Sequence, residues 1–293
     1  LLQITLHDEA GGGRDMLLSY DHFEDLLKDS YYTGAMIGRY AGRIAGASFS
    51  IENRQYTLAA NDGQTGNHLH GGYNGFHKKY FRETICAADE QQARLQLSGK
   101  SLTLEEGYPG NLDIVFSLVL TERKEVRLQY EVTTDAATFI NLTHHPYFTL
   151  GAANAANILK LQINAAKRLE YDNHYIPNGN IIPALNEYDF RQAKCIPASI
   201  SFNEYYIFSS ADSRAPRAIL TNPLSGDSME VYCSHPGLLF YSGDFLHHPF
   251  QPRQGICLET QDYPNAPNIK DFPDTLYYPG KPYQAFTEFR FKN

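Results

Sequence analysis

The chain has 293 residues, of which 42% are apolar and 20% are charged, a composition typical of a globular protein with a sizeable hydrophobic core. The formal net charge is −8 and no run of basic residues occurs, which argues against nucleic acid as a partner. No apolar stretch approaches the roughly 18 residues of a membrane-spanning helix, so we expect no membrane association.

The cysteines and the N-terminal segment bear on the cellular compartment. The four cysteines form no C-x-x-C pair, which in a chain of this length predicts free thiols in a reducing compartment. The opening segment LLQITLHDEAGGG has neither the basic region nor the cleavage signature of a signal peptide. We therefore expect a cytoplasmic protein, and the sequence is compatible with a monomer or a homodimer.

In chain order, most elements are expected to be β-strands. LLQITL resembles a strand already under way, so the native N-terminus is expected to extend upstream. Residues 21–28 are the best short helix, with Asp21 as a possible cap and Phe23, Leu26 and Leu27 on one face. Residues 49–58 indicate a hairpin that turns near Asn53.

The later segments alternate apolar and polar residues with a period of two. In 126–132, for example, Val126, Leu128, Tyr130 and Val132 share one face. The other expected strands are 93–97, 114–120, 158–163, 229–232 and 285–291. With no linker or composition break, these patterns predict an all-β fold, a large antiparallel β-sandwich with few short helices, in a single domain over residues 1–293.

Two segments carry histidines that suit catalysis. His68 and His70 would lie on the same face of a strand, where they could bind a metal or divide into one catalytic and one structural histidine. No third ligand lies at the required spacing, which disfavours the metal. The adjacent His144 and His145 point to opposite faces of a strand, so one of them can face a cleft and transfer protons near neutral pH.

Glu259 is the most informative single residue. It follows the apolar run Ile256–Leu258, and a carboxylate at such a position costs free energy unless it is paired or used. Burial raises its pKa towards the range that is useful for proton transfer at neutral pH. A structural ion pair with an arginine is the alternative interpretation.

The chemistry that fits these parts is acid–base catalysis on a neutral, hydroxyl-rich ligand. The chain has no nucleophile elbow, phosphate-binding loop or dinucleotide-binding loop. A carboxylate base and an imidazole acid can together open a sugar hemiacetal, with each group contributing about 10²–10⁴-fold. This reaction requires neither a metal nor a cofactor, and its partner is a small-molecule sugar.

Six segments resemble, in order and spacing, those of the aldose 1-epimerases, also called galactose mutarotases. They are GRYAGRIA, NHLHGG, EEGYPGNL, NLTHHPYF, IPNG and CLETQDYPNAPN. The resemblance extends from about Met16 to the closing strand, and we expect the family's N-terminal strands to be only partly represented in this sequence. It implies a large antiparallel β-sandwich and an isomerase that interconverts the α- and β-anomers of an aldohexose.

The resemblance also implies roles for individual residues. Glu259 matches the catalytic base at the anomeric hydroxyl, and His145 matches the acid that protonates the ring oxygen. His70 matches the partner of that acid near the same oxygen. Arg43 matches an arginine that binds a sugar hydroxyl, and Gln261 is expected to orient the base.

Two departures from the family pattern bear on sugar specificity. Gly42 stands where the family usually has Asn, which implies the loss of one ligand hydrogen bond or its replacement by water. The family also has an Asp-His pair whose Asp grips sugar hydroxyls. Glu204 is the better match for that Asp, with Tyr205 in place of the His, and Asn203 is the alternative register. A longer carboxylate would alter specificity.

Two other functions are compatible with the sequence. A relative that acts on a different or phosphorylated sugar would use additional cationic residues, for which Lys78, Lys79 and Arg82 are candidates. A non-catalytic carbohydrate-binding or sensing protein would be expected to lack the acid or the base, and this chain retains both.

Overall fold

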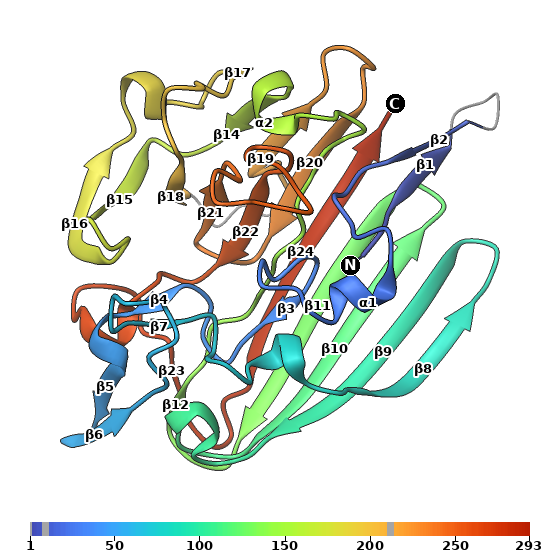
Figure 1. Ribbon diagram of the computed structural model, residues 1–293. Helices are drawn as coiled ribbons and strands as arrows, with labels where there is room; N and C mark the ends of the chain where they lie inside the picture. Colours follow the sequence, from blue (N-terminus) through green and yellow to red (C-terminus); the bar gives the residue numbers. More distant parts are fainter. Residues whose placement is uncertain (1, 8–11, 210–213) are drawn as a thin grey trace.

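The computed structural model describes residues 2–7, 12–209 and 214–293 (Figure 1). Antiparallel strands dominate it, and the helices of the described residues are the short α1 (Phe23–Leu26) and α2 (Ala155–Ile158) and a few 3₁₀ turns. Two large sheets share the main hydrophobic core, so the predicted β-sandwich is confirmed. No helix in the described ranges has the length and apolar character needed to cross a membrane.

The larger sheet has nine strands in the order β17-β14-β19-β20-β24-β11-β10-β9-β8. Its strands are β8 (Arg82–Ala88), β9 (Gln92–Ser101), β10 (Leu112–Thr121), β11 (Glu125–Thr134), β14 (Lys160–Ile163), β17 (Lys194–Cys195), β19 (Ala218–Thr221), β20 (Ser228–Cys233) and β24 (Tyr283–Lys292). The period-two pattern sets the register, because Phe116 pairs with Tyr130 and both are buried in the core.

The smaller sheet has five strands in the order β16-β15-β18-β21-β22 and carries Glu259 on its last strand. The strands are β15 (Lys167–Tyr171), β16 (Pro177–Pro183), β18 (Asn203–Ile207), β21 (Gly237–Tyr241) and β22 (Cys257–Gln261). One face contributes Phe240 and Leu258 to the main core, and the other contributes Tyr241 and Cys257 to a second apolar cluster. Every residue of β21 and β22 is therefore buried.

Two-stranded ribbons position the remaining site residues. β4 (Arg43–Ile44) pairs with β7 (His68–Leu69), and β13 (Thr143–His144) pairs with β3 (Met36–Ile37). The other ribbons are β1 (Thr5–His7) with β2 (Gly13–Asp15), β5 (Ser48–Ile51) with β6 (Arg54–Thr57), and β12 (Thr138–Phe139) with β23 (Leu276–Tyr277).

Local predictions had mixed outcomes at the start of the chain. The hairpin is confirmed, and its turn uses left-handed backbone at Glu52 (φ 49°) and Asn53 (φ 65°). The helix is shorter than predicted, because His22 rather than Asp21 precedes it and no side chain caps it. Its supposed apolar face is not buried, since Phe23 is 66% exposed. Within LLQITL only Thr5 and Leu6 are in a strand, and Leu1 lies outside the described residues.

Arg39 anchors the loop that leads to the site. It is 2% exposed, and its guanidinium donates to Ser101 Oγ and to the carbonyl oxygens of Pro109 and Leu102, at 2.9, 2.9 and 2.7 Å. Arg39 is therefore a buried structural residue and not a solvated surface arginine. Its side chain connects the segment before β4 to the loop between β9 and β10.

We expect Arg39→Met to destabilise the fold, because the buried Ser101 hydroxyl and Pro109 carbonyl and the part-buried Leu102 carbonyl would lose their donors. The free energy of unfolding should fall by about 2–4 kcal/mol. Urea unfolding followed by circular dichroism measures this. Arg82→Met is the matched control, because Arg82 is exposed and should change stability by less than about 0.5 kcal/mol. Equal losses in the two variants would contradict the anchoring role.

Candidate active site

Three segments that are distant in the chain bring together Glu259, His145 and His70. Glu259 lies on β22, His145 follows β13 and His70 follows β7. Nε2 of His145 lies 3.4 Å from Oε1 of Glu259, and the two imidazole centroids are 5.5 Å apart with planes at 88°. The structure thus places in one cluster the three residues expected to do the chemistry.

Glu259 is a buried carboxyl group without a conventional hydrogen-bond partner. The residue is 1% exposed, and neither carboxylate oxygen has a hydrogen bond within the described part of the chain. Strand alternation points its side chain, like that of Cys257, away from the main core. Burial raises the pKa of Glu259 to about 8, while the positive charge of Arg43 acts in the opposite direction.

His145 lies between two side chains of β22. Its Nε2 faces Glu259, and its Nδ1 lies 3.5 Å from Sγ of Cys257. The backbone N–H of His145 donates to the carbonyl oxygen of Ala35 at 3.0 Å, which fixes the main chain at the ribbon end. Burial lowers the pKa of His145 to about 4, so its imidazole is neutral at pH 7.

His70 is held as a hydrogen-bond donor towards the pocket. Its Nδ1 accepts the backbone N–H of Gly42 at 3.2 Å, so the neutral imidazole carries its proton on Nε2. Burial and the nearby His145 lower the pKa of His70 well below its usual value. Gly42 has φ +76°, and a Cβ there would lie 2.9 Å from Cβ of Pro264. Glycine therefore allows the backbone to reach His70.

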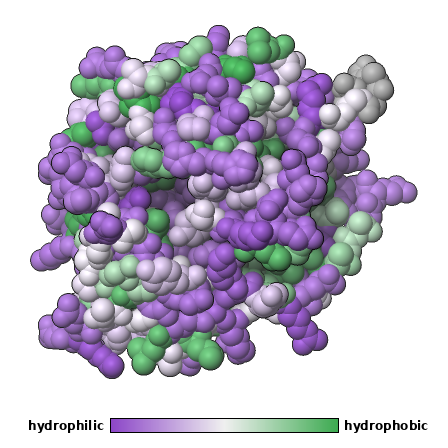
Figure 2. Space-filling view, viewed as in Figure 1, coloured by the Kyte–Doolittle hydropathy of each residue, from purple (hydrophilic) through white to green (hydrophobic). Residues whose placement is uncertain are grey.

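These groups line a pocket of about 180 Å³. That volume is below the roughly 300–1,000 Å³ of pockets for drug-sized ligands and suits a single small sugar. Aromatic and aliphatic residues form half of the wall: Tyr31, Tyr32, Leu69, Tyr147, Leu239, Tyr241 and Phe245. The face of the molecule seen in Figure 2 is mostly hydrophilic, and its hydrophobic residues form small separate groups.

Arg43 lines the pocket but is already paired. Its Nε donates to Oδ2 of Asp62 at 2.8 Å, and its guanidinium lies 5.3 Å from the ring centroid of Tyr175. The aspartate and the ring hold the guanidinium at the pocket wall, where it retains N–H groups for a ligand.

The two registers considered for the sugar-gripping residue are distinguished by the structure. Asn203 lines the pocket, whereas Glu204 does not. Adjacent residues of a strand point to opposite faces, and Glu204 instead binds Arg168, with Oε2 2.7 Å from Nη1. The expectation that Glu204 is the better match is therefore not supported by its placement, and Asn203 takes the position at the pocket.

Gln261 does not line the pocket and does not form the expected hydrogen bond with Glu259. It is fully buried on β22, and within the described residues its side-chain amide atoms have no hydrogen-bond partner. The orientation of Glu259 by Gln261 thus has no hydrogen bond to support it.

His68 and His144 have structural roles, because His68 forms hydrogen bonds with Ala59 and Tyr108 while His144 forms one with Tyr130.

The cationic residues considered for a sugar phosphate lie away from the pocket. None of Lys78, Lys79 and Arg82 contributes to its lining. Lys79 forms an ion pair with Glu105, and Arg82 is exposed on β8. The pocket's one cation among the described residues, Arg43, is neutralised by Asp62, so the structure offers little for a phosphate group.

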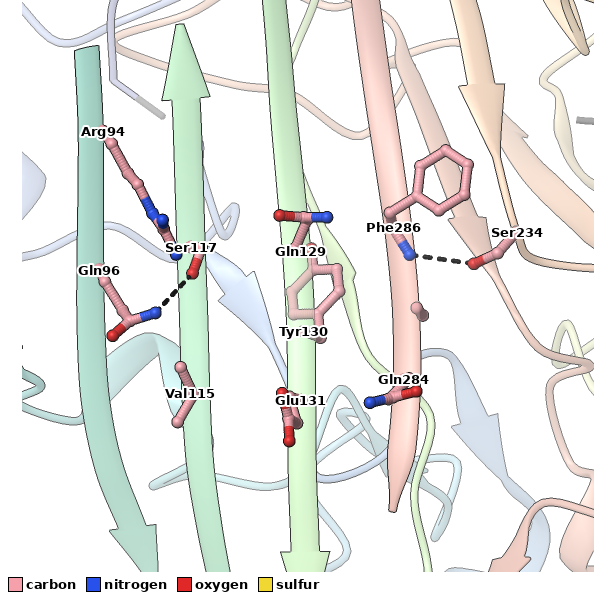
Figure 3. Close-up of a pocket in the computed structure, with 11 residues that line it drawn as sticks. Arg94, Gln96, Val115, Ser117, Gln129, Tyr130, Glu131, Ser234, Gln284 and Phe286 are labelled. Carbon is pink, nitrogen blue, oxygen red and sulfur yellow. Dashed lines mark hydrogen bonds between the residues drawn. The ribbon is translucent and has the colours of Figure 1, made fainter. Parts of the chain in front are cut away.

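A larger hollow of about 390 Å³ lies on the outer face of the nine-stranded sheet (Figure 3). Amides, hydroxyls and the Phe286 ring line it, and Gln96 donates to Ser117 across neighbouring strands at 3.1 Å. Its carboxyl group, Glu131, is exposed and shows no pairing with a buried imidazole. We therefore place the chemistry in the smaller pocket around Glu259.

The same three side chains have a spacing that a metal ion can use. Ligand atoms of His70, His145 and Glu259 lie within 4.8 Å of one another. However, the hydrogen bond from Gly42 leaves a proton on Nε2 of His70, and a protonated nitrogen cannot ligate a metal. The donor arrangement therefore fits acid–base chemistry better than metal binding.

Sequence reasoning missed the residues that hold the site in place. Asp62, Tyr32 and Cys257 all contact predicted residues, with the Tyr32 ring 4.9 Å from that of His70. Cys257 had one visible signal, since it lies two residues before Glu259 in a strand and so shares its face. Nothing in the sequence indicated that Asp62 pairs with Arg43.

Comparison with known proteins agrees with this architecture. The sequence model of the aldose 1-epimerase family matches residues 1–290. Galactose mutarotase from Bos taurus is 32% identical over 98% of this chain and 87% of its own length, and aldose 1-epimerase from Escherichia coli is 30% identical over 99% and 89%. The chain therefore belongs to the aldose 1-epimerase family, whose enzymes are isomerases.

Solved structures show the same fold. An aldose epimerase homologue from C. elegans superposes with a TM-score of 0.92 at 22% identity, over 100% of this chain and 92% of that chain. Galactose 1-epimerase from Lactobacillus acidophilus gives a TM-score of 0.86 at 25% identity, over 99% of this chain and 94% of that chain.

We expect Glu259→Gln to stabilise the protein at neutral pH. Because burial raises the Glu259 pKa from 4.5 to about 8, ionisation costs stability progressively as pH rises through that interval. The variant should exceed the wild type by about 3 kcal/mol near pH 7, and the gap should vanish near pH 4. Urea unfolding at several pH values measures this. Exposed Glu131→Gln should show no such trend.

Proposed function

We propose that the protein is an aldose 1-epimerase that interconverts the α- and β-anomers of a free aldohexose. The observation that carries this proposal is the contact between the buried carboxyl group of Glu259 and Nε2 of His145, with His70 beside it. An acid and a base within reach of one ring carbon are what hemiacetal opening requires. A role in carbohydrate metabolism and a cytoplasmic location, in line with the unpaired thiols, belong to the same proposal.

The two catalytic groups share one proton. With a pKa of about 8 for Glu259 and about 4 for His145, the pair holds a single proton over the neutral range. The 3.4 Å contact lets this proton move from Oε1 to Nε2, which gives a carboxylate and an imidazolium. That ionic form is the active one, since it contains both a base and an acid.

In the reaction, Glu259 removes the proton from the anomeric hydroxyl while His145 protonates the ring oxygen. The bond between C1 and the ring oxygen breaks, its electron pair stays on that oxygen, and C1 becomes an aldehyde. Rotation about C1–C2 exposes the other face, and the reverse transfers close the ring. His70, whose Nε2 carries its proton, donates a hydrogen bond to the ring oxygen throughout.

The remaining pocket residues bind and orient the sugar. Arg43 and Asn203 offer hydrogen bonds, and the rings of Tyr147 and Tyr241 offer apolar faces for the C–H groups of the sugar. Several relatives are named galactose mutarotases, so galactose is the first substrate to test. The chain departs from the family pattern at Gly42 and at the pair Asn203–Glu204, of which Asn203 lines the pocket. Glucose is therefore the second substrate to test.

The decisive measurement is the rate of anomer exchange, by polarimetry or NMR saturation transfer, with galactose and glucose. The wild type should accelerate exchange of at least one sugar, and a chelator should not reduce the rate. Glu259→Gln should lower kcat by at least about 10²-fold because the base is lost. Saturation-transfer detection of sugar binding to the variant serves as the control. Full activity in Glu259→Gln would exclude the mechanism.

The neighbouring pair Asn203 and Glu204 allows a matched test of sugar binding. Asn203→Ala should raise KM by about tenfold with little effect on kcat, because a hydrogen bond from the pocket wall is lost. Glu204→Gln should leave KM unchanged, because its side chain faces Arg168 on the other side of the sheet. The opposite ranking in steady-state kinetics would restore Glu204 as the binding residue.

A further inference from the structure

His145 must keep one particular nitrogen free to do the proposed chemistry. Protons reach and leave this imidazole at Nε2, which faces Glu259. A neutral imidazole that exchanges protons at Nε2 must carry its other proton on Nδ1. His70 shows the opposite case, because the Gly42 N–H occupies its Nδ1 and fixes the proton on Nε2. The partner of Nδ1 in His145 therefore determines which role this histidine can have.

The side chain that faces Nδ1 of His145 is the thiol of Cys257. Sγ lies 3.5 Å from Nδ1 of His145, within hydrogen-bonding distance for sulfur. Cys257 is fully buried on β22, two residues before Glu259 and on the same face of the strand. The imidazole of His145 thus spans two side chains of one strand, with sulfur at one nitrogen and the carboxyl group at the other.

We propose that Cys257 is a positioning residue for His145, whose Nδ1–H donates to Sγ and so leaves Nε2 as the nitrogen that exchanges protons. The inference rests on the proposed function, since it concerns how the acid of that reaction is prepared. A thiol suits this position because sulfur accepts while its S–H is only a weak donor. The thiol is therefore a poor donor to Nδ1. It does not favour the other tautomer, in which Nδ1 has no proton and Nε2 carries one.

The surroundings of Cys257 support this assignment. Burial and the neighbouring Glu259 raise the pKa of the thiol well above its usual value, so it does not ionise and take the proton itself. The Tyr147 ring lies 5.0 Å from that of His145 and limits rotation of the imidazole. The Tyr147 hydroxyl donates to the carbonyl oxygen of Tyr31 at 3.1 Å, and its hydrogen bond with the Cys257 thiol acts on the thiol pKa in the opposite direction to burial.

The chain offers a matched control in Cys233. This second buried cysteine lies on β20, where its Sγ is 3.7 Å from the carbonyl oxygen of His235. It is as buried as Cys257 and does not line the pocket. Cys233→Ala thus reports the cost of removing a buried sulfur without touching His145.

The experiment compares the wild type with Cys257→Ala, Cys257→Ser and Cys233→Ala in full-length protein. Long-range ¹H–¹⁵N correlation spectra at neutral pH identify the tautomer of His145 without any sugar. We expect Nδ1–H in the wild type and in Cys233→Ala, and a shift towards Nε2–H in Cys257→Ala. In Cys257→Ser we expect a smaller shift, because the hydroxyl accepts from Nδ1–H but also donates to Nδ1 more strongly than a thiol does. Anomer exchange should then show kcat lowered about tenfold in Cys257→Ala, with KM within about twofold, and an intermediate kcat in Cys257→Ser.

Three results would overturn the proposal. They are an Nε2–H tautomer in the wild type, an unchanged tautomer in Cys257→Ala, and equal losses of kcat in Cys257→Ala and Cys233→Ala. The tautomer of His145 is measured in the absence of substrate. A wild type that turns over no sugar would therefore count against the proposed function but not against the contact between Cys257 and His145. Thermal unfolding of each variant verifies that the fold is retained.

Discussion

The desolvation of one carboxyl group is the constraint on which the rest of this structure depends. Glu259 is 1% exposed and lacks a conventional hydrogen bond among the described residues, so its charged form is costly. A strand buried on both faces in a protein with two packed sheets can tolerate that cost. The same burial raises the pKa of Glu259 to about 8, which is the range that the proposed proton transfer requires.

Rigid and less regular parts of the fold contribute different groups to the site. Glu259 and Cys257 come from the five-stranded sheet, whereas His70 and His145 follow short ribbons. Backbone hydrogen bonds hold each histidine, from His145 to Ala35 and from His70 to Gly42, so the imidazoles do not depend on side-chain packing alone. This division gives precise placement to residues outside the large sheets.

The strands and the candidate catalytic residues could be predicted from the sequence, but the pairing of individual side chains could not. Period-two patterns located β10 and β11 because each strand has one buried face. They did not decide whether Asn203 or Glu204 faces the pocket, because a register shift of one residue moves every side chain of a strand to the opposite face. Only the packed sheet fixes that register. The role of Gln261 and the partner of Arg43 likewise depend on contacts between distant segments, which a single sequence does not show.

The origin of the site in three distant segments has a consequence for folding. His70, His145 and Glu259 meet only after the ribbons have docked on the five-stranded sheet, which requires the closure of long loops. Long-range pairing of this kind is slow relative to the formation of local hairpins such as β5–β6. Recovery of the acid–base cluster during refolding would therefore follow the appearance of strand structure, and it marks the completion of the tertiary fold.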